Sequence, residues 1–438
     1  MQSTTRAPAA PALTQRQVVA AISFSALGWA FDLFDLFILL YVAPVLAKVF
    51  FPSGQQLLSL AGIYAAFTAT LLMRPVGGWV FGRYADRQGR KRAMVVAATG
   101  VGLATALMGA LPTVQSIGLL APLLFLALRL VQGVFMGGMV ASTHTLGTES
   151  IAPARRGLAS GIISGGGSGV GKLLASLVFL LVSSVFHGPA FAQWGWRVMF
   201  FSGLLSSLLG LFVFTRLHES PLWEALQRGE RAAATSAVPA AASLRQFVPV
   251  VLLCIVLTTA GGGLSYLTSG YLPTFMKLVN HVKPQQLGLI LSVSALAVIA
   301  SSVLSGHLSD RLGRRHAMLI YGLVSLVAIP LLYLGLAHAN SLARIGLYSV
   351  LLSAAGTFCY APLMIVLNER YPTSIRASAT AVSWNIGFAL GGSMPVLVSL
   401  VAKVSSGLSG SLAWSTAALA AIYLVATLAT PTRRNLMR

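Results

Sequence analysis

Two short charged stretches of the sequence decide the fold: GRYADRQGRKR at residues 82–92 and GHLSDRLGRR at residues 306–315. Each has a glycine, then an Asp-Arg pair, then a second glycine followed by basic residues. The second stretch begins 224 residues after the first, and a further match, Glu149 and Arg156 with Glu369 and Arg376, repeats at 220 residues. Two signals at nearly one spacing indicate that the chain contains two structural repeats.

The sequence around these stretches is strongly apolar. Of the 438 residues, 56% are hydrophobic and 9% are charged, whereas soluble domains carry about 25% charged residues. Because so few charges cannot cover a water-facing surface, most of the chain must face lipid. Disordered, fibrous and disulfide-framework classes are excluded as well. Cys254 and Cys359 both lie in apolar runs, which argues against a structural disulfide.

Twelve apolar segments have the length of a membrane-spanning helix, about 20 residues. Helices are expected because no alternation of strands and turns runs through these segments. We expect the first to be retained in the protein, since no small-residue cleavage site follows it. The expected spans are 18–47, 57–82, 93–111, 117–145, 157–186, 197–217, 247–276, 286–308, 317–337, 343–367, 377–402 and 411–430.

Lysine and arginine are distributed unevenly between the two predicted faces. With the N-terminus inside, 21 of the 30 basic residues fall on the inner side, 6 fall on the outer side and 3 lie within spans. This asymmetry predicts that both termini are cytoplasmic, and it explains the net charge of +21 without nucleic acid. The outer basic residues are Lys48, Arg197, Lys277, Lys283, Arg344 and Lys403.

The repeat predicts how the chain is divided. We expect an N-terminal tail at 1–16, a first six-helix bundle at 17–217, and a second bundle at 247–430. The polar, alanine-rich stretch 218–246 is the expected cytoplasmic linker, and residues 431–438 form the C-terminal tail.

The doubled loop motif within twelve spans closely resembles the major facilitator superfamily over nearly the whole chain. RPVGG at 74–78, RLVQG at 129–133 and WGWR at 194–197 resemble its metabolite:proton symporter branch, and HESP at 218–221 is shared with sugar porters. DLFD at 32–35 is similar to the paired acids of proton-linked lactate, sialate and phosphate symporters. Span 5 lacks the Gly-Pro motif of drug/proton antiporters, which argues against efflux. The resemblance implies an all-α integral membrane protein with twelve transmembrane helices in two pseudo-symmetric six-helix bundles.

Asp32 and Asp35 are the candidate proton carriers. They are the only acids within an expected span; the other seven lie in or beside inner loops. An ionised carboxylate at this depth costs several kcal/mol, so it persists where it is paired, hydrated or functional. Three residues apart, the two acids face one side of the helix. Arg129, near the midplane of span 4, is the expected partner, and a purely structural ion pair with Arg129 is the alternative interpretation.

The candidate substrate contacts come from both repeats. Lys172 lies near the midplane of span 5, and Arg129 is a second intramembrane cation. From the second repeat we select Tyr266, Tyr271, Trp384 and Asn385, for which ordinary bundle packing is the alternative. The repeat maps Arg129 onto Ser349 and Lys172 onto Gly392, so the intramembrane charges are not duplicated. We therefore assign proton coupling to the first repeat. Arg74 is expected close to the inner surface, where it either snorkels or braces the gate, and a contact with the ligand is the alternative.

The duplicated loops are a candidate cytoplasmic gate. The resemblance implies that they pair with neighbouring charges to hold the inside closed, and such ion networks form and break at modest cost. The alternative is a topology signal with solvated charges. The gate residues are Asp86, Arg90, Glu149, Arg155, Arg156, Asp310, Arg314, Glu369 and Arg376.

These observations predict a proton-coupled symporter that imports a small organic anion, a carboxylate, by alternating access. The alternatives are a zwitterion such as a betaine, a sugar-type substrate, or proton-linked export. A channel is disfavoured by the duplicated gate. An enzyme is disfavoured because no catalytic constellation, nucleotide-binding loop or metal-binding cluster is visible. We expect no cofactor besides the coupling proton, no nucleic-acid partner, a monomer, and a bacterial inner membrane.

Overall fold

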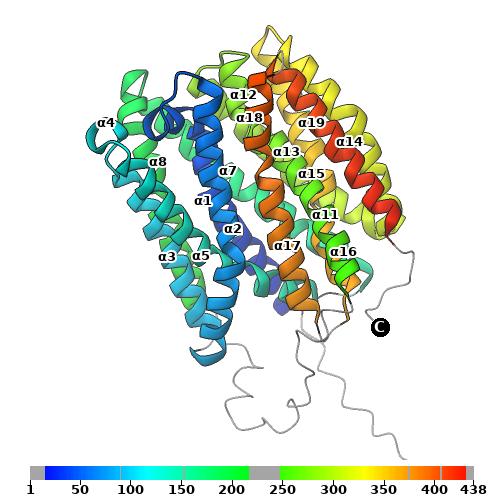
Figure 1. The fold of residues 1–438 in the computed structure, drawn as a ribbon. Coiled ribbons are helices and arrows are strands. Elements are labelled where there is room, and N and C mark those ends of the chain that lie inside the picture. Colours follow the sequence, from blue (N-terminus) through cyan, green and yellow to red (C-terminus); the bar gives the residue numbers. More distant parts are fainter. Residues whose placement is uncertain are drawn as a thin grey trace, which may run out of the picture.

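The computed structural model describes residues 15–88, 90–149, 151, 153–216, 247–372, 375–404 and 407–430, and these are almost entirely helical (Figure 1). The predicted linker and both predicted tails, apart from Gln15 and Arg16, lie outside them. The first set of elements is α1 (Gln15–Phe50), α2 (Gln56–Gln88), α3 (Arg90–Ala110), α4 (Val114–Ile117), α5 (Leu120–Glu149), η1 (Pro153–Arg155), α6 (Arg156–Ser160), η2 (Gly161–Gly166), α7 (Gly167–Val185), η3 (Phe191–Gly195) and α8 (Trp196–Arg216). The second set is α11 (Val248–Ser265), η5 (Tyr266–Gly270), α12 (Leu272–Leu278), α13 (Pro284–Leu312), α14 (Arg314–Ala337), α15 (Leu342–Tyr360), α16 (Leu363–Arg370), α17 (Arg376–Gly392), α18 (Met394–Val404) and α19 (Leu408–Ala429).

The predicted spans are confirmed within a few residues at most ends. Eleven helical segments of the described chain are long and apolar enough to cross a membrane, and α8 occupies the remaining predicted segment at 197–217. The largest differences are at the duplicated loops, where the helices continue well past the predicted span ends. α2 runs to Gln88 and α13 to Leu312, so each loop is mostly helix.

A glycine separates the helices at the second duplicated loop. Gly313 has φ +82°, which the helix on either side does not permit. It ends α13 and lets α14 begin at once with Arg314. Two consecutive spans are thus joined by a single residue, and the charged side chains of the loop are held on helix ends.

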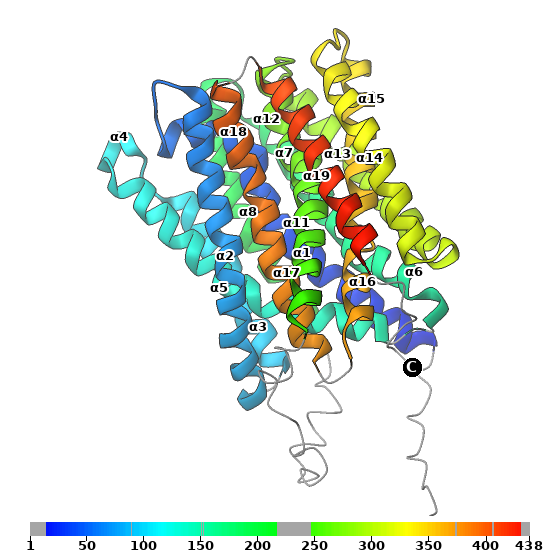
Figure 2. The same cartoon turned by 45° about the vertical axis from the view of Figure 1, so that its right-hand side comes forward.

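The two halves of the described chain meet along two seams. α7 packs along α13, and α2 packs against α17 and α18. Both views show the orange helices α17 and α18 beside the blue helix α2 (Figures 1 and 2). The repeat relates spans 5 and 8 to spans 11 and 2, so these seams are equivalent, as expected for two pseudo-symmetric bundles.

Candidate functional site

Arg74 and Asp32 form a buried ion pair between α2 and α1. The Nη2 of Arg74 donates to both carboxylate oxygens of Asp32 at 2.9 Å, and each side chain is 2% exposed. The expectation that Arg74 lies close to the inner surface is therefore wrong. The reason is the length of α2: Gln88, where the helix ends, is fourteen residues beyond Arg74, or about 21 Å along the axis.

Arg129 lies in a second polar site, inside the first half. Its Nη1 donates to Gln132 Oε1 at 2.6 Å, and Gln132 Nε2 donates to Thr105 Oγ1 at 2.7 Å. The guanidinium also sits over the Phe125 ring, 5.3 Å from its centroid. Asp35 is the acid whose charge acts on Arg129. The structure thus brings Arg129 near Asp35, while Asp32 has a different cation.

The two acids of α1 therefore lie in different surroundings. Asp35 Oδ1 packs against Gly203 of α8, where an added Cβ would lie 3.0 Å from it. Asp32 and its partner Arg74 instead act electrostatically on Tyr266 and a further tyrosine, Tyr360, both from the second half. Residues three apart in a helix are separated by about 60° around its axis. That angle is enough to aim one acid into the first bundle and the other towards the second.

Lys172 is a buried cation on α7. It is 3% exposed, its Nζ lies 4.9 Å from the centroid of the Phe37 ring, and its backbone carbonyl accepts a 3.3 Å hydrogen bond from Tyr41. No carboxylate of the described residues forms an ion pair with it. A buried ammonium without a counter-charge is costly, so this position is poised for an anionic ligand.

An aromatic cluster lies beside the Asp32–Arg74 pair. Trp384 of α17 contacts Trp29 of α1 edge-on at 5.6 Å between centroids and stacks on Phe388 at 5.0 Å. Tyr266 packs on Phe388 at 5.0 Å, and Trp29 Nε1 donates to the Tyr360 hydroxyl at 3.1 Å. The cluster joins the two halves at the depth of the ion pair.

Three hydrogen-bond donors in this region have no acceptor among the described residues. They are the Nε of Arg74, the hydroxyl of Tyr266 and the Nε1 of Trp384, all buried. Buried donors are nearly always satisfied in folded proteins. Their convergence around one ion pair and one aromatic cluster marks a site that can receive oxygen acceptors. Asn385, also selected from the sequence, uses its Nδ2 on the Ala381 carbonyl at 2.9 Å, and its Oδ1 has no donor among the described residues.

Tyr271 makes a different set of contacts from Tyr266. Its hydroxyl hydrogen-bonds Ser399 at 3.0 Å, and its ring stacks on Tyr64 of α2 at 5.1 Å. Tyr64 in turn hydrogen-bonds Thr274 of α12 at 2.7 Å. Tyr271 therefore belongs to a contact between the halves at the end of the bundle that carries α12 (Figure 1).

At the opposite end, the second duplicated loop binds the first half. Asp310 accepts hydrogen bonds from the backbone N–H groups of Gly157 and Leu158, at 2.9 and 2.8 Å. Arg314 pairs with Asp310 at 2.7 Å and with Glu369 at 3.1 Å. The carboxylate thus caps α6 of the other half, where helix N–H groups favour negative charge. An added Cβ at Gly157 would lie 2.7 Å from the backbone carbonyl oxygen of Gly306, so this approach requires glycine.

The remaining gate candidates are described unevenly. The side chains of Asp86, Arg90 and Glu149 lie outside the described part of the chain. Arg155 is exposed, Arg156 is half-buried, and Arg376 is buried, with its Nε donating to the Tyr371 carbonyl at 3.3 Å. The structure therefore assembles Asp310, Arg314 and Glu369 into one ion network.

Sequence reasoning missed four members of these sites. They are Arg74 as the partner of Asp32, Gln132 as the hydrogen-bond acceptor of Arg129, and Trp29 and Tyr360 in the aromatic cluster. Arg74 and Gln132 carried a usable signal, since each is a polar side chain within an apolar span. The two aromatic residues carried none, because large apolar side chains are ordinary in such helices. Among the described residues, no group of His, Cys, Asp and Glu is arranged to hold a metal ion.

Comparison with known proteins agrees with this architecture. The model of the Major Facilitator Superfamily matches residues 25–396 and 261–435. The inner membrane metabolite transport protein YhjE of Escherichia coli (strain K12) is 31% identical, over 94% of this chain and 93% of the relative. The alpha-ketoglutarate permease of the same organism is 28% identical over 95% and 94%, and its proline/betaine transporter is 28% identical over 89% and 78%.

The fold also matches solved structures. A partially occluded, inward-open structure of the xylose transporter XylE from E. coli superposes with a TM-score of 0.70 at 18% identity, covering 94% of this chain and 97% of that one. At this identity the likeness concerns the fold. The family match over most of the sequence and the relative that is 31% identical show that the chain is a multi-pass membrane transporter of the metabolite type, not an enzyme, and belongs to the major facilitator superfamily.

Proposed function

We propose that this chain is a proton-coupled symporter that imports a small carboxylate by alternating access. The observation that carries the proposal is the arrangement of buried charge in the first half. Asp32 and Asp35 each have a cation nearby, Arg74 and Arg129, whereas Lys172 has no carboxylate partner among the described residues. With all five groups ionised, one buried positive charge is in excess. A bound monocarboxylate cancels it.

Proton coupling follows from competition for Arg74. When a proton neutralises Asp32, Arg74 loses its charged partner and becomes available to an incoming carboxylate. Binding of the proton and binding of the anion then favour each other, and the coupling is reciprocal. Arg74 differs in this from Arg129, which is held by Gln132 within the first bundle. We assign Asp32 to the exchange with substrate and Asp35, beside Arg129, to a second proton site.

The substrate contacts we propose are Lys172, Arg74, Tyr266 and Trp384. The last three offer buried donors without acceptors, which suits carboxylate oxygens. Asn385, whose Oδ1 is likewise without a partner, is an additional contact for a substrate hydroxyl. Tyr271 we assign to closure of the end that carries α12, because Ser399 and Tyr64 already occupy it.

The Asp310, Arg314 and Glu369 network is the proposed cytoplasmic latch. It joins the halves through the hydrogen bonds that Asp310 accepts from the Gly157 and Leu158 N–H groups. When these bonds break, Asp310 keeps Arg314 as its partner, so no isolated charge is left buried. By the repeat, Asp86, Arg90, Glu149 and Arg376 form the equivalent latch on the other seam. Arg155 and Arg156 directly precede Gly157 and therefore belong to the seam of the Asp310 network.

A zwitterion such as a betaine is the second candidate. The aromatic cluster of Trp29, Tyr266, Tyr360, Trp384 and Phe388 favours it, because ring faces bind quaternary ammonium groups. One relative is named a proline/betaine transporter. The excess buried positive charge favours the anion.

Uptake into proteoliposomes tests the proposal. The panel contains lactate, succinate, alpha-ketoglutarate, glycine betaine, proline and xylose, each with and without an inward proton gradient. We expect saturable, gradient-driven accumulation of a carboxylate and none of xylose. Accumulation of betaine alone would support the second candidate. Accumulation that is the same with and without the proton gradient, and that is lost when the gradient of another ion is removed, would overturn proton coupling.

A further inference from the structure

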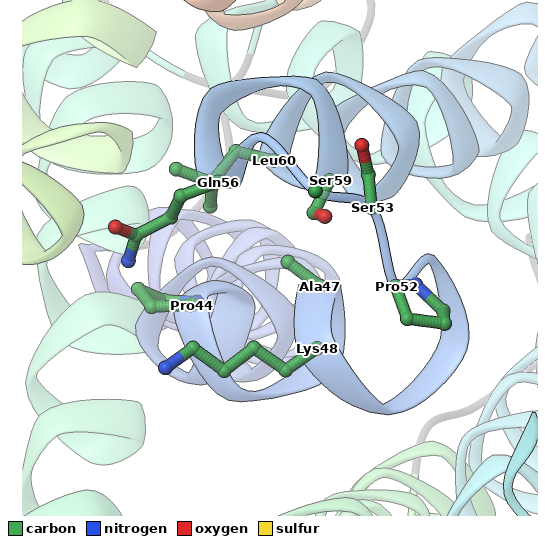
Figure 3. Close-up of a pocket in the computed structure, with 9 residues that line it drawn as sticks. Pro44, Ala47, Lys48, Pro52, Ser53, Gln56, Ser59 and Leu60 are labelled. Carbon is green, nitrogen blue, oxygen red and sulfur yellow. The ribbon is translucent and has the colours of Figure 1, made fainter. Parts of the chain in front are cut away.

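A small pocket opens between the end of α1 and the start of α2. It has a volume of about 330 Å³, enough for a small organic anion, and it is lined by Lys48, Ser53, Gln56 and Ser59 together with prolines on either side. Figure 3 shows Lys48 and Gln56 extending towards the same side of the pocket, with Pro44 between them. This is the predicted outer end of the bundle, far from the Asp310 network.

The polar groups of this pocket suit a carboxylate. Lys48 is exposed and forms no ion pair with the described residues. Ser59 is 4% exposed, lines the pocket, and its hydroxyl has no hydrogen bond to any described residue. Gln56 begins α2, a helix of 33 residues, so the first N–H groups of that helix lie beside the pocket and favour negative charge. An ammonium, an amide and a buried free hydroxyl thus surround one small volume.

The charged residues at the predicted outer end of the protein are all basic. None of the nine acidic residues of the sequence falls in a predicted outer segment. Lys277, on α12 of the second half, is close enough to Lys48 for the two charges to interact. Packing against the protein, and then the like charge of Lys48, lower the pKa of Lys277. A second cavity of about 850 Å³ shares Lys48 and Pro52 with the pocket and adds Arg197.

The pocket also lies beside the route that must open. α12, which carries Lys277, packs against α1, and the Tyr64 contacts with Thr274 and Tyr271 close the same end of the seam. An anion held at Lys48 is therefore at the rim of the passage between the halves, next to a second cation across the seam.

We propose that this pocket is an outer capture site for carboxylates, in which Lys48 binds the anion and Lys277 adds attraction from the other half. The inference rests on the proposed import of an anion, and it adds a binding step before the buried site is reached. Fixed positive charges at the rim raise the local concentration of anions. This attraction weakens as salt screens the charges.

Cysteine modification tests the pocket without knowledge of the substrate. The chain has two cysteines, Cys254 and Cys359, both buried, so Ser53→Cys introduces one accessible thiol at the pocket. We expect an anionic methanethiosulfonate to modify it faster than a cationic one of similar size. Adding Lys48→Gln should lower this rate ratio roughly three- to tenfold, and Lys277→Gln about twofold.

Matched controls separate the pocket from general surface charge. Lys283→Gln removes another exposed, predicted outer lysine that does not line the pocket, and it should leave the ratio within about 1.5-fold. Succinate should slow modification of Ser53→Cys by a neutral reagent, and Lys48→Gln should remove this protection. A rate ratio that is the same with and without Lys48→Gln, or protection that survives Lys48→Gln, would overturn the capture site.

The outcome is independent of the central site. Lys172 is buried on α7, so Lys172→Gln should leave both the rate ratio and the succinate protection unchanged. If proton-driven carboxylate uptake occurs but the pocket shows neither effect, the capture site is wrong and the proposed function stands. If both pocket effects occur but no carboxylate is accumulated, the pocket binds anions and the proposed function is wrong.

Discussion

The two halves of this transporter share a helical scaffold but bury different chemistry. Within the described spans, the first half buries Asp32, Asp35, Arg74, Arg129 and Lys172, whereas no charged side chain is buried within the described spans of the second half. The second half instead buries seven of the nine tyrosines in the described core, at positions 266, 271, 321, 333, 360, 371 and 423. The duplicated fold thus buries charged side chains in its first half and neutral hydrogen-bond donors in its second half.

This difference fits the proposed function, in which the first half binds the proton and the second half orients the substrate. Proton binding needs groups that change charge, and these lie in the first half. Ligand orientation needs fixed donors and apolar surface, which tyrosine and tryptophan provide with few rotatable bonds. At the position equivalent to Arg129, the second half has Ser349, whose hydroxyl is satisfied by the Ile345 carbonyl. The charged residues of the duplicated loops, in contrast, are present in both repeats.

The largest expected effect is on coupling. Asp32→Asn and Asp35→Asn should abolish proton-driven accumulation, because each removes a titratable group, while exchange of substrate across the membrane remains measurable. Thr259→Ala, at the position that the repeat pairs with Asp35, is the control and should still accumulate substrate. The measurement is the steady-state concentration ratio in proteoliposomes. An equal loss in Thr259→Ala would show that coupling is not confined to the first half.

The next effect is on stability. Arg74→Gln leaves Asp32 as a buried carboxylate without its cation, which should cost about 3–5 kcal/mol. The double variant Asp32→Asn/Arg74→Gln should recover most of that loss, because neither member of the pair is left as an unpaired buried charge. Thermal unfolding in detergent measures both, with the exposed Arg83→Gln as the control. If the double variant is no more stable than Arg74→Gln, the pair is not an isolated unit.

Lys172→Gln should affect binding without destabilising the protein. Losing a charged contact to a carboxylate is worth about 1.5–3 kcal/mol, so affinity for the anion should fall by about tenfold or more. Stability should stay the same or rise, since an uncompensated buried charge has been removed. This combination distinguishes Lys172 from Arg74, whose loss destabilises. Wild-type affinity in Lys172→Gln would contradict its proposed role.

The smallest effect is on the latch. Asp310→Asn weakens the cap on α6 and the pairing with Arg314, so the transport rate should change several-fold while KM stays within about twofold. A cysteine placed at Ser302, which is fully buried on α13, should become more reactive from the cytoplasmic side in this background. Arg311→Gln, an exposed neighbour outside the network, is the control. Unchanged rate and reactivity in Asp310→Asn would favour the topology interpretation of the duplicated loops.

Much of the architecture could be predicted from the sequence. Apolar length determines how many helices can cross a bilayer, and the spacing of the two charged loops shows the repeat, because both depend on local composition. The same is true of the identity of the buried charges, since an ionisable side chain in a long apolar run stands out whatever its neighbours are. On this basis the sequence alone identifies Asp32, Asp35, Arg129 and Lys172 as intramembrane charges.

Only the tertiary structure decided which of these groups meet. Pairing of Asp32 with Arg74 depends on α2 continuing as a helix to Gln88 and on how α1 and α2 are rotated against each other. The aromatic cluster depends on α1, η5, α15 and α17 meeting at one depth. Hydropathy reports how deep a residue lies but not the direction in which its side chain points. Because partners come from helices far apart in the sequence, the packing of the two halves, and not the chain itself, determines the site.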